Sequence, residues 1–97
     1  MVYTVGVADL KISDESADML ITYALGSCLG VTVYDFRKKT GGLLHCMMPD
    51  SGIDQNKAAG NPYLYVDSGM KAMMDKFYQK GSRKSDLIIR VAGGSSS

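Results

Sequence analysis

The chain has 97 residues, and its 11 basic and 10 acidic side chains give a formal net charge of +1. This length predicts one compact domain over residues 1–97. The composition, 45% hydrophobic and 22% charged, is typical of a chain that folds. So small a net charge provides no broad positive field, which argues against nucleic acid as a partner.

The sequence also argues against a membrane protein. No stretch of about 18 apolar residues could span a bilayer, so we expect no membrane insertion. The first residues lack the charged segment and apolar core of a secretory signal. The expected location is the cytoplasm, where a reducing environment keeps the two cysteines as free thiols.

Three apolar runs in the first third of the chain predict β-strands. The first two are Tyr3–Ala8 and Met19–Leu25, separated by the polar segment Ser13–Asp18. A glycine and a serine follow, and Cys28 then opens a third strand, Leu29–Tyr34, which is rich in β-branched residues.

A hairpin is predicted next. The segment Asp35–Gly42 contains the basic run Arg37–Lys39 and a Gly-Gly pair, and we interpret it as a solvated loop leading into a fourth strand, Leu43–Met48. His45 lies in the middle of that strand. The segment Pro49–Gly52 carries turn-forming residues that end it.

One helix is predicted after the polar loop that reaches Gly60. Asn61 is a good capping residue and Pro62 suits a first helical position, while Gly81 is suited to end a helix. Oppositely charged residues four apart, such as Lys71 and Asp75, indicate a solvent-facing side. An apolar stripe recurs on a 3.6-residue period at Val66, Met70, Met73, Met74 and Phe77.

The last apolar run, Asp86–Ala92, predicts a strand, for a total of about five strands and one helix. The segment Ser95–Ser97 is interpreted as a flexible tail on composition. Gly93 and Gly94 belong to no phosphate-binding pattern, so no nucleotide cofactor is expected.

Two residues are candidates for nucleophilic chemistry. His45 is the only histidine, although a lone histidine in an apolar strand is commonly structural. Cys28 follows a small, glycine-containing turn, where the backbone N–H groups of Gly26 and Ser27 could hold the oxyanion of a tetrahedral intermediate. A cysteine with an unperturbed pKa of about 8.5 needs a nearby imidazole to act as a nucleophile at neutral pH. The short hairpin makes contact between the strands of Cys28 and His45 plausible.

Thr22 and Cys46 each have two interpretations. The Thr22 hydroxyl could accept a hydrogen bond from the imidazole and fix its tautomer, or Thr22 could simply be a β-favouring residue. Cys46 would complete two cysteines and a histidine for a zinc site. Adjacent strand residues point to opposite faces, so His45 and Cys46 cannot easily bind one ion. We therefore expect no metal site and interpret Cys46 as a core residue.

Three segments resemble the CheD family of chemoreceptor glutamine deamidases. They are Thr-Tyr-Ala-Leu-Gly-Ser-Cys at 22–28, Gly-Gly-Leu-Leu-His at 41–45 and Met-Pro-Asp-Ser-Gly at 48–52. The segments Tyr-Val-Asp at 65–67 and Ala-Gly-Gly at 92–94 are similar to further family landmarks, so the resemblance runs through nearly the whole chain.

The resemblance implies an α+β fold of the three-layer α/β/β sandwich type, shared with deamidating toxins. It also implies a catalytic triad, in which Cys28 is the nucleophile, His45 the general base and acid, and Thr22 the group that orients the imidazole. Family members continue beyond their Ala-Gly-Gly landmark with a further helix and strands. The resemblance therefore predicts that this single CheD-like domain lacks its C-terminal part.

The implied activity is hydrolysis of glutamine side-chain amides on methyl-accepting chemotaxis receptors through a cysteine thioester. The same chemistry would cleave a glutamyl methyl ester. The resemblance also implies binding to a CheC-type phosphatase. A non-catalytic module that binds such a phosphatase or a receptor, and a general thiol protease, are the alternatives.

Overall fold

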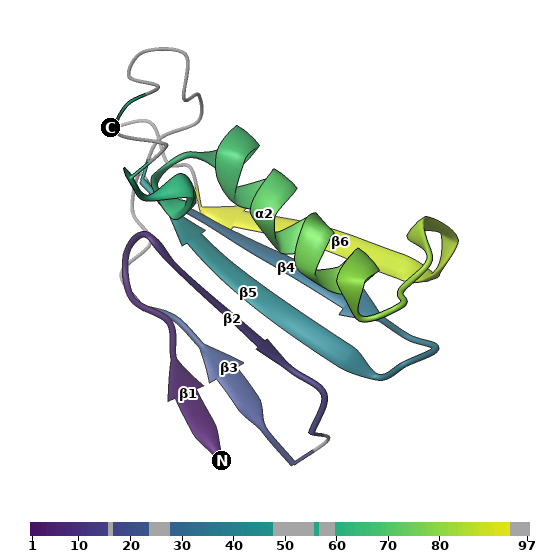
Figure 1. The fold of residues 1–97 in the computed structure, drawn as a ribbon. Coiled ribbons are helices and arrows are strands. Elements are labelled where there is room, and N and C mark those ends of the chain that lie inside the picture. The colour runs from purple at the N-terminus through teal and green to yellow at the C-terminus, as the bar shows by residue number, and fades with distance from the viewer. Residues whose placement is uncertain (16, 24–27, 48–55, 57–59, 94–97) are drawn as a thin grey trace.

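The computed structural model describes residues 1–15, 17–23, 28–47, 56 and 60–93. Four antiparallel strands form a sheet in the order β2-β5-β4-β6, and β1 and β3 form a separate parallel pair (Figure 1). The strands are β1 (Val2–Thr4), β2 (Asp9–Ser13), β3 (Met19–Ile21), β4 (Leu29–Asp35), β5 (Thr40–Cys46) and β6 (Leu87–Gly93). Among the described residues, the helices whose bounds are defined are α2 (Val66–Gln79) and two short 3-10 helices, η2 (Pro62–Leu64) and η3 (Lys84–Asp86).

The predicted hairpin forms the centre of the larger sheet. Strands β4 and β5 pair from Leu29 opposite Cys46 to Asp35 opposite Thr40. The loop is shorter than predicted, because β5 begins at Thr40 and includes both glycines of the Gly-Gly pair. Gly42 allows close packing of the strand against α2, since a Cβ there would lie 3.0 Å from the Phe77 ring and the ring would have to shift by a few tenths of an ångström.

Strand β2 was not predicted, whereas β1 and β3 are shorter than the predicted runs. Strand β2 pairs with β5, with Leu10 opposite Leu44 and Ile12 opposite Gly42. Leu10 and Ile12 pack against the core, while the three polar residues of the strand alternate with them. The alternation is that of a half-buried strand, and only its last residue, Ser13, falls within the segment Ser13–Asp18 that was interpreted as a polar separator.

The predicted apolar stripe of α2 is confirmed. Met73 and Phe77 are fully buried and pack with residues of β4 and β5, and Val66, Met70 and Met74 are partly buried against the same core. Gly69 allows the helix to approach β5, since a Cβ there would lie only 2.9 Å from the Leu44 side chain. On the outer face Lys71 and Asp75 form the expected ion pair, at 3.1 Å.

The two ends of α2 differ in how well they were predicted. Asn61 caps η2 by accepting a hydrogen bond from the Tyr63 N–H, so the helix proper begins only at Val66. At the other end Gly81 has a φ of +92°. The Ser82 N–H donates to the Phe77 carbonyl there, and the Gly81 N–H donates to the Tyr78 carbonyl, which is a Schellman motif.

Asp35 joins the hairpin to the end of the helix. Its carboxylate accepts hydrogen bonds from the backbone N–H groups of Arg37 and Lys38 and from the Ser82 hydroxyl. The Ser82 bond is the main cause that lowers the pKa of Asp35 below its usual value. The basic run therefore lies in a turn held by a buried acid, consistent with its interpretation as a solvated loop.

The final strand has the predicted position but not the burial that an apolar run suggests. Strand β6 pairs with β4 alone among the described residues, which makes it an edge strand. Three of its large apolar side chains are 42–62% exposed: Ile88, Ile89 and Val91. The predicted serine tail lies outside the described residues.

Together these elements confirm a mixed α+β fold. The helix α2 covers one face of the four-stranded sheet (Figure 1). Strand β3 of the parallel pair contacts β5 of this sheet. The three-layer α/β/β arrangement and the single truncated domain stay predictions. None of the described helices is long and apolar enough to cross a membrane.

Candidate functional site

His45 lies near the end of β5, between the two neighbouring strands of the sheet. Its Cα partners are Gly30 of β4 and Asp9 of β2, and the side chain is only 1% exposed. Cys46 is the next residue and belongs to the core under α2. Because successive side chains of a strand alternate, His45 faces away from the helix.

Thr22 reaches this histidine from just beyond the end of β3. Its Oγ1 atom lies 2.9 Å from Nδ1 of His45, within hydrogen-bond distance. The same hydroxyl donates a hydrogen bond of 2.7 Å to the main-chain carbonyl of Val5. The other ring nitrogen, Nε2, is buried and has no hydrogen-bond partner within the described part of the chain. Within that part, Nε2 is therefore the ring nitrogen with no hydrogen bond.

Cys28 lies at a bend immediately before β4 and is partly exposed. Cys28 precedes Gly30, the Cα partner of His45, by two residues, so Cys28 and His45 lie at the same end of the sheet. Since Nε2 has no partner and Nδ1 is bonded to Thr22, no hydrogen bond joins Cys28 to His45 among the described residues. The predicted oxyanion residues Gly26 and Ser27 lie outside the described residues.

Cys46 differs sharply from Cys28 in its surroundings. It is fully buried, as predicted for a core residue. Burial raises the pKa of the Cys46 thiol from its ordinary value of 9.0 to about 11, and electrostatic interactions with Asp67 and Cys28 add to the shift. The folded state therefore holds the neutral thiol, and its contribution to stability is present below pH 9.0 and is lost as the pH rises toward 11.

We expect this difference to appear in alkylation. At pH 8 iodoacetamide should add once to the native chain, at Cys28, because Cys46 is buried and protonated. In denaturant both thiols should react. Mass spectrometry of intact and digested protein measures the adducts, and Cys28→Ser should remove the native-state adduct. Equal labelling of the two cysteines in the native chain would contradict this assignment.

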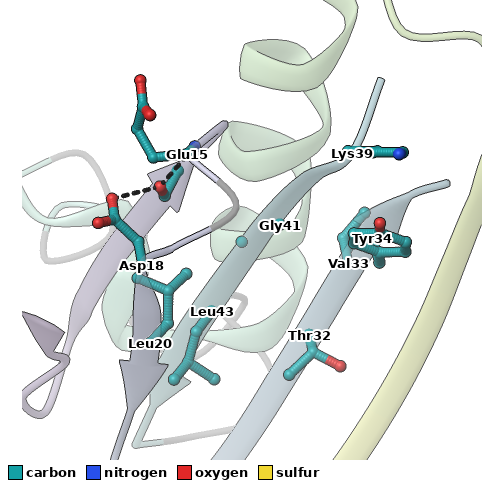
Figure 2. Close-up of a pocket in the computed structure, with 11 residues that line it drawn as sticks. Glu15, Asp18, Leu20, Thr32, Val33, Tyr34, Lys39, Gly41 and Leu43 are labelled. Carbon is teal, nitrogen blue, oxygen red and sulfur yellow. Dashed lines mark hydrogen bonds between the residues drawn. The ribbon is translucent and has the colours of Figure 1, made fainter. Parts of the chain in front are cut away.

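A pocket of about 380 Å³ lies farther along the same sheet (Figure 2). Its apolar wall includes Leu20 and Leu43, and its polar wall includes Asp18. The Asp18 carboxylate accepts hydrogen bonds from the Ser13 hydroxyl and from the amino terminus of Met1. The Asp18 carboxylate is therefore already hydrogen-bonded within the chain. None of the predicted catalytic residues lines the pocket, so we assign the pocket no ligand.

The sequence interpretation missed the contact with Val5. No signal could have identified it, because the group that contacts Thr22 is a main-chain carbonyl, which every residue type carries. Within the described ranges, no three His, Cys, Asp or Glu side chains gather in a way that could hold a metal ion. The candidate site is thus a buried imidazole with Nδ1 hydrogen-bonded to Thr22 and with Nε2 unpartnered among the described residues.

Comparisons with known proteins agree with the resemblance. Relatives named probable chemoreceptor glutamine deamidases occur in Syntrophus aciditrophicus, at 44% identity over 92 residues, and in Solibacter usitatus, at 41% over 92 residues. Another, in Clostridium tetani, is 43% identical over 94 residues. These matches cover 95%, 95% and 97% of this chain, but only 58%, 54% and 55% of the relatives.

The chain thus spans a little over half the length of these relatives. The family model described as CheD chemotactic sensory transduction matches residues 47–97, just over half of this chain. The chain belongs to the CheD family.

Proposed function

We propose that this chain carries the reacting groups of a chemoreceptor glutamine deamidase, which converts glutamine side chains to glutamate. The single observation that carries the proposal is the imidazole of His45, with Nδ1 bonded to Thr22 and Nε2 unpartnered among the described residues. The names of the relatives, probable chemoreceptor glutamine deamidase, supply the substrate class.

In the first half of the reaction, His45 Nε2 takes the proton of the Cys28 thiol. The resulting thiolate attacks the carboxamide carbon of a receptor glutamine. A tetrahedral oxyanion forms, for which the backbone N–H groups of Gly26 and Ser27 are the proposed donors. The protonated imidazole then gives its proton to the amide nitrogen, which leaves as ammonia, and a thioester remains.

In the second half, Nε2 takes a proton from water as the water oxygen attacks the thioester carbonyl. The C–S bond breaks, the sulfur leaves as the thiolate and recovers the proton, and glutamate is released. The net reaction is amide plus water to acid plus ammonia. A glutamyl methyl ester would follow the same route, with methanol leaving in place of ammonia.

The mechanism requires the Cys28 sulfur to approach Nε2 when substrate binds. Cys28 lies at a bend outside the paired part of β4, so no strand hydrogen bond has to break for such a movement. Catalytic hydrogen bonds are often long in a protein without substrate and shorten in the complex. Binding of a CheC-type phosphatase is a further prediction, which rests on family membership alone.

The test is incubation of this chain with the methyl-accepting helices of a chemotaxis receptor. We expect particular glutamines to become glutamates, with one ammonia released for each conversion, as measured by peptide mass spectrometry and an ammonia assay. Helices that bind the folded chain and keep all their glutamines would overturn the proposal and make the chain a binding module.

A further inference from the structure

We propose that the main-chain carbonyl of Val5 is a positioning group for His45. By taking the hydroxyl hydrogen of Thr22, it makes Thr22 a hydrogen-bond acceptor toward the imidazole. Neutral His45 then carries its hydrogen on Nδ1, and Nε2 is left as the base. The assignment of the tautomer stands on the geometry, whereas its value for catalysis rests on the proposed function.

The argument begins with the number of hydrogens available. The Thr22 hydroxyl has one hydrogen and, among the described residues, two hydrogen-bond partners, the Val5 carbonyl at 2.7 Å and Nδ1 of His45 at 2.9 Å. A carbonyl oxygen can only accept, so the hydroxyl hydrogen lies between Thr22 and Val5. The bond to the ring is then made only if Nδ1 carries a hydrogen and donates it to Oγ1.

The positions of Val5 and His45 are set by main-chain bonds. Val5 is 2% exposed, and its N–H donates to the Ile21 carbonyl at 2.8 Å, which continues the pairing of β1 with β3. The Ala8 N–H donates to the His45 carbonyl, also at 2.8 Å. The segment that leaves β1 is therefore fixed against both the residue before Thr22 and the strand that carries His45. This gives the small parallel sheet a role in the site.

The consequence for proton transfer is direct. With hydrogen on Nδ1, Nε2 has a free lone pair and can take a proton from the Cys28 thiol. After it does so, Nδ1 still donates to Thr22, and the bond from Thr22 to Val5 is unchanged. If the Val5 carbonyl were a weak acceptor, the Thr22 hydroxyl could instead donate to Nδ1. That arrangement selects the tautomer with hydrogen on Nε2, which has no lone pair there to accept a proton.

The chain suits a direct test, because His45 is its only histidine. In a 15N-labelled sample, at a pH where the imidazole is neutral, the two ring nitrogens are told apart by their different couplings to the ring C–H hydrogens, and their chemical shifts then report the tautomer. We expect hydrogen on Nδ1 in the native chain. Thr22→Ser should keep this preference because it keeps the hydroxyl, and Thr22→Val should lose it.

The Val5 carbonyl can be weakened without changing a side chain. A synthetic peptide of residues 1–27, with an ester in place of the Val5–Gly6 amide, can be ligated at Cys28 to a labelled segment of residues 28–97. The Gly6 N–H, which the ester removes, makes no hydrogen bond among the described residues. We expect the preference for hydrogen on Nδ1 to fall at least about threefold, the effect of weakening one hydrogen bond.

The matched control is an ester at the Gly6–Val7 bond. Neither the Gly6 carbonyl nor the Val7 N–H takes part in the hydrogen bonds that join Val5, Thr22 and His45, so the tautomer ratio should stay native. A native ratio in the Val5–Gly6 ester, or hydrogen on Nε2 in the unmodified chain, would overturn the role of Val5. The measurement needs no substrate, so a native tautomer together with unchanged receptor glutamines would defeat the proposed function and leave this inference standing.

Discussion

Cys28→Ala is expected to abolish deamidation of receptor glutamines, with a loss of at least about 10⁴-fold in kcat. Alanine has no sulfur to form the thioester, and no neighbouring group in the proposed mechanism can replace it. The variant should fold normally, because Cys28 is partly exposed and lies outside the core. The measurement is the initial rate of glutamate formation by mass spectrometry, with far-ultraviolet circular dichroism to verify folding.

The second cysteine provides the matched control. Cys46→Ala removes the same side chain from the core, where the thiol is buried and protonated, so activity per folded molecule should stay close to that of the unchanged chain. If Cys28→Ala keeps an activity within tenfold of that of the unchanged chain, the assignment of Cys28 as the nucleophile is wrong. Loss of activity in a fully folded Cys46→Ala would show that the wrong cysteine had been chosen.

A variant that lacks both the Cys28 and the His45 side chains tests whether the two residues act in the same chemical step. If Cys28 and His45 act in one chemical step, removing both should cost about as much as removing either one, since groups that act as a unit have strongly non-additive effects. Losses that multiply would mean that the two residues act independently. This comparison also separates a catalytic histidine from one that only supports the fold.

Local patterns were enough to predict the parts of the fold that depend on neighbouring residues. The stripe through Met73 and Phe77 follows from helical period, and the end of α2 follows from the tolerance of Gly81 for positive φ. Strand β2 was missed although Leu10 and Ile12 alternate with polar residues, because five residues are too few to establish the two-residue period of a strand. The exposure of β6 follows from its place at the edge of the described sheet, which a local pattern cannot report.

In the candidate site too, local patterns predicted some residues, whereas others depend on contacts between distant parts of the chain. Cys28 and His45 could be selected by residue type and spacing, but Thr22 could be raised above an ordinary strand residue only by the family resemblance. Its contact with His45 joins residues 23 apart in the chain, one just beyond the end of β3 and the other in β5 of the larger sheet. Val5 contributes a backbone atom, so its part in the site depends on where β1 packs. Long-range packing, which sequence patterns specify weakly, therefore sets the geometry around His45.

Phe77→Ala is expected to lower the free energy of unfolding by about 3–5 kcal/mol. The ring is fully buried and packs against the core shared by α2 and the sheet, so its removal leaves a large cavity. Native domains have only about 5–15 kcal/mol of stability in total, so a large fraction would be lost. Urea titration followed by circular dichroism at 222 nm measures the change.

Tyr78→Ala is the control, since the next residue of the same helix is an aromatic side chain that is 42% exposed. Its cost should be within about 0.5 kcal/mol of zero, as for other surface changes. Similar losses for the two variants would contradict the core assignment. Phe77 packs on the helix side of the sheet, whereas His45 faces the other side. Deamidation by Phe77→Ala should therefore fall in proportion to the unfolded fraction, with unchanged activity per folded molecule.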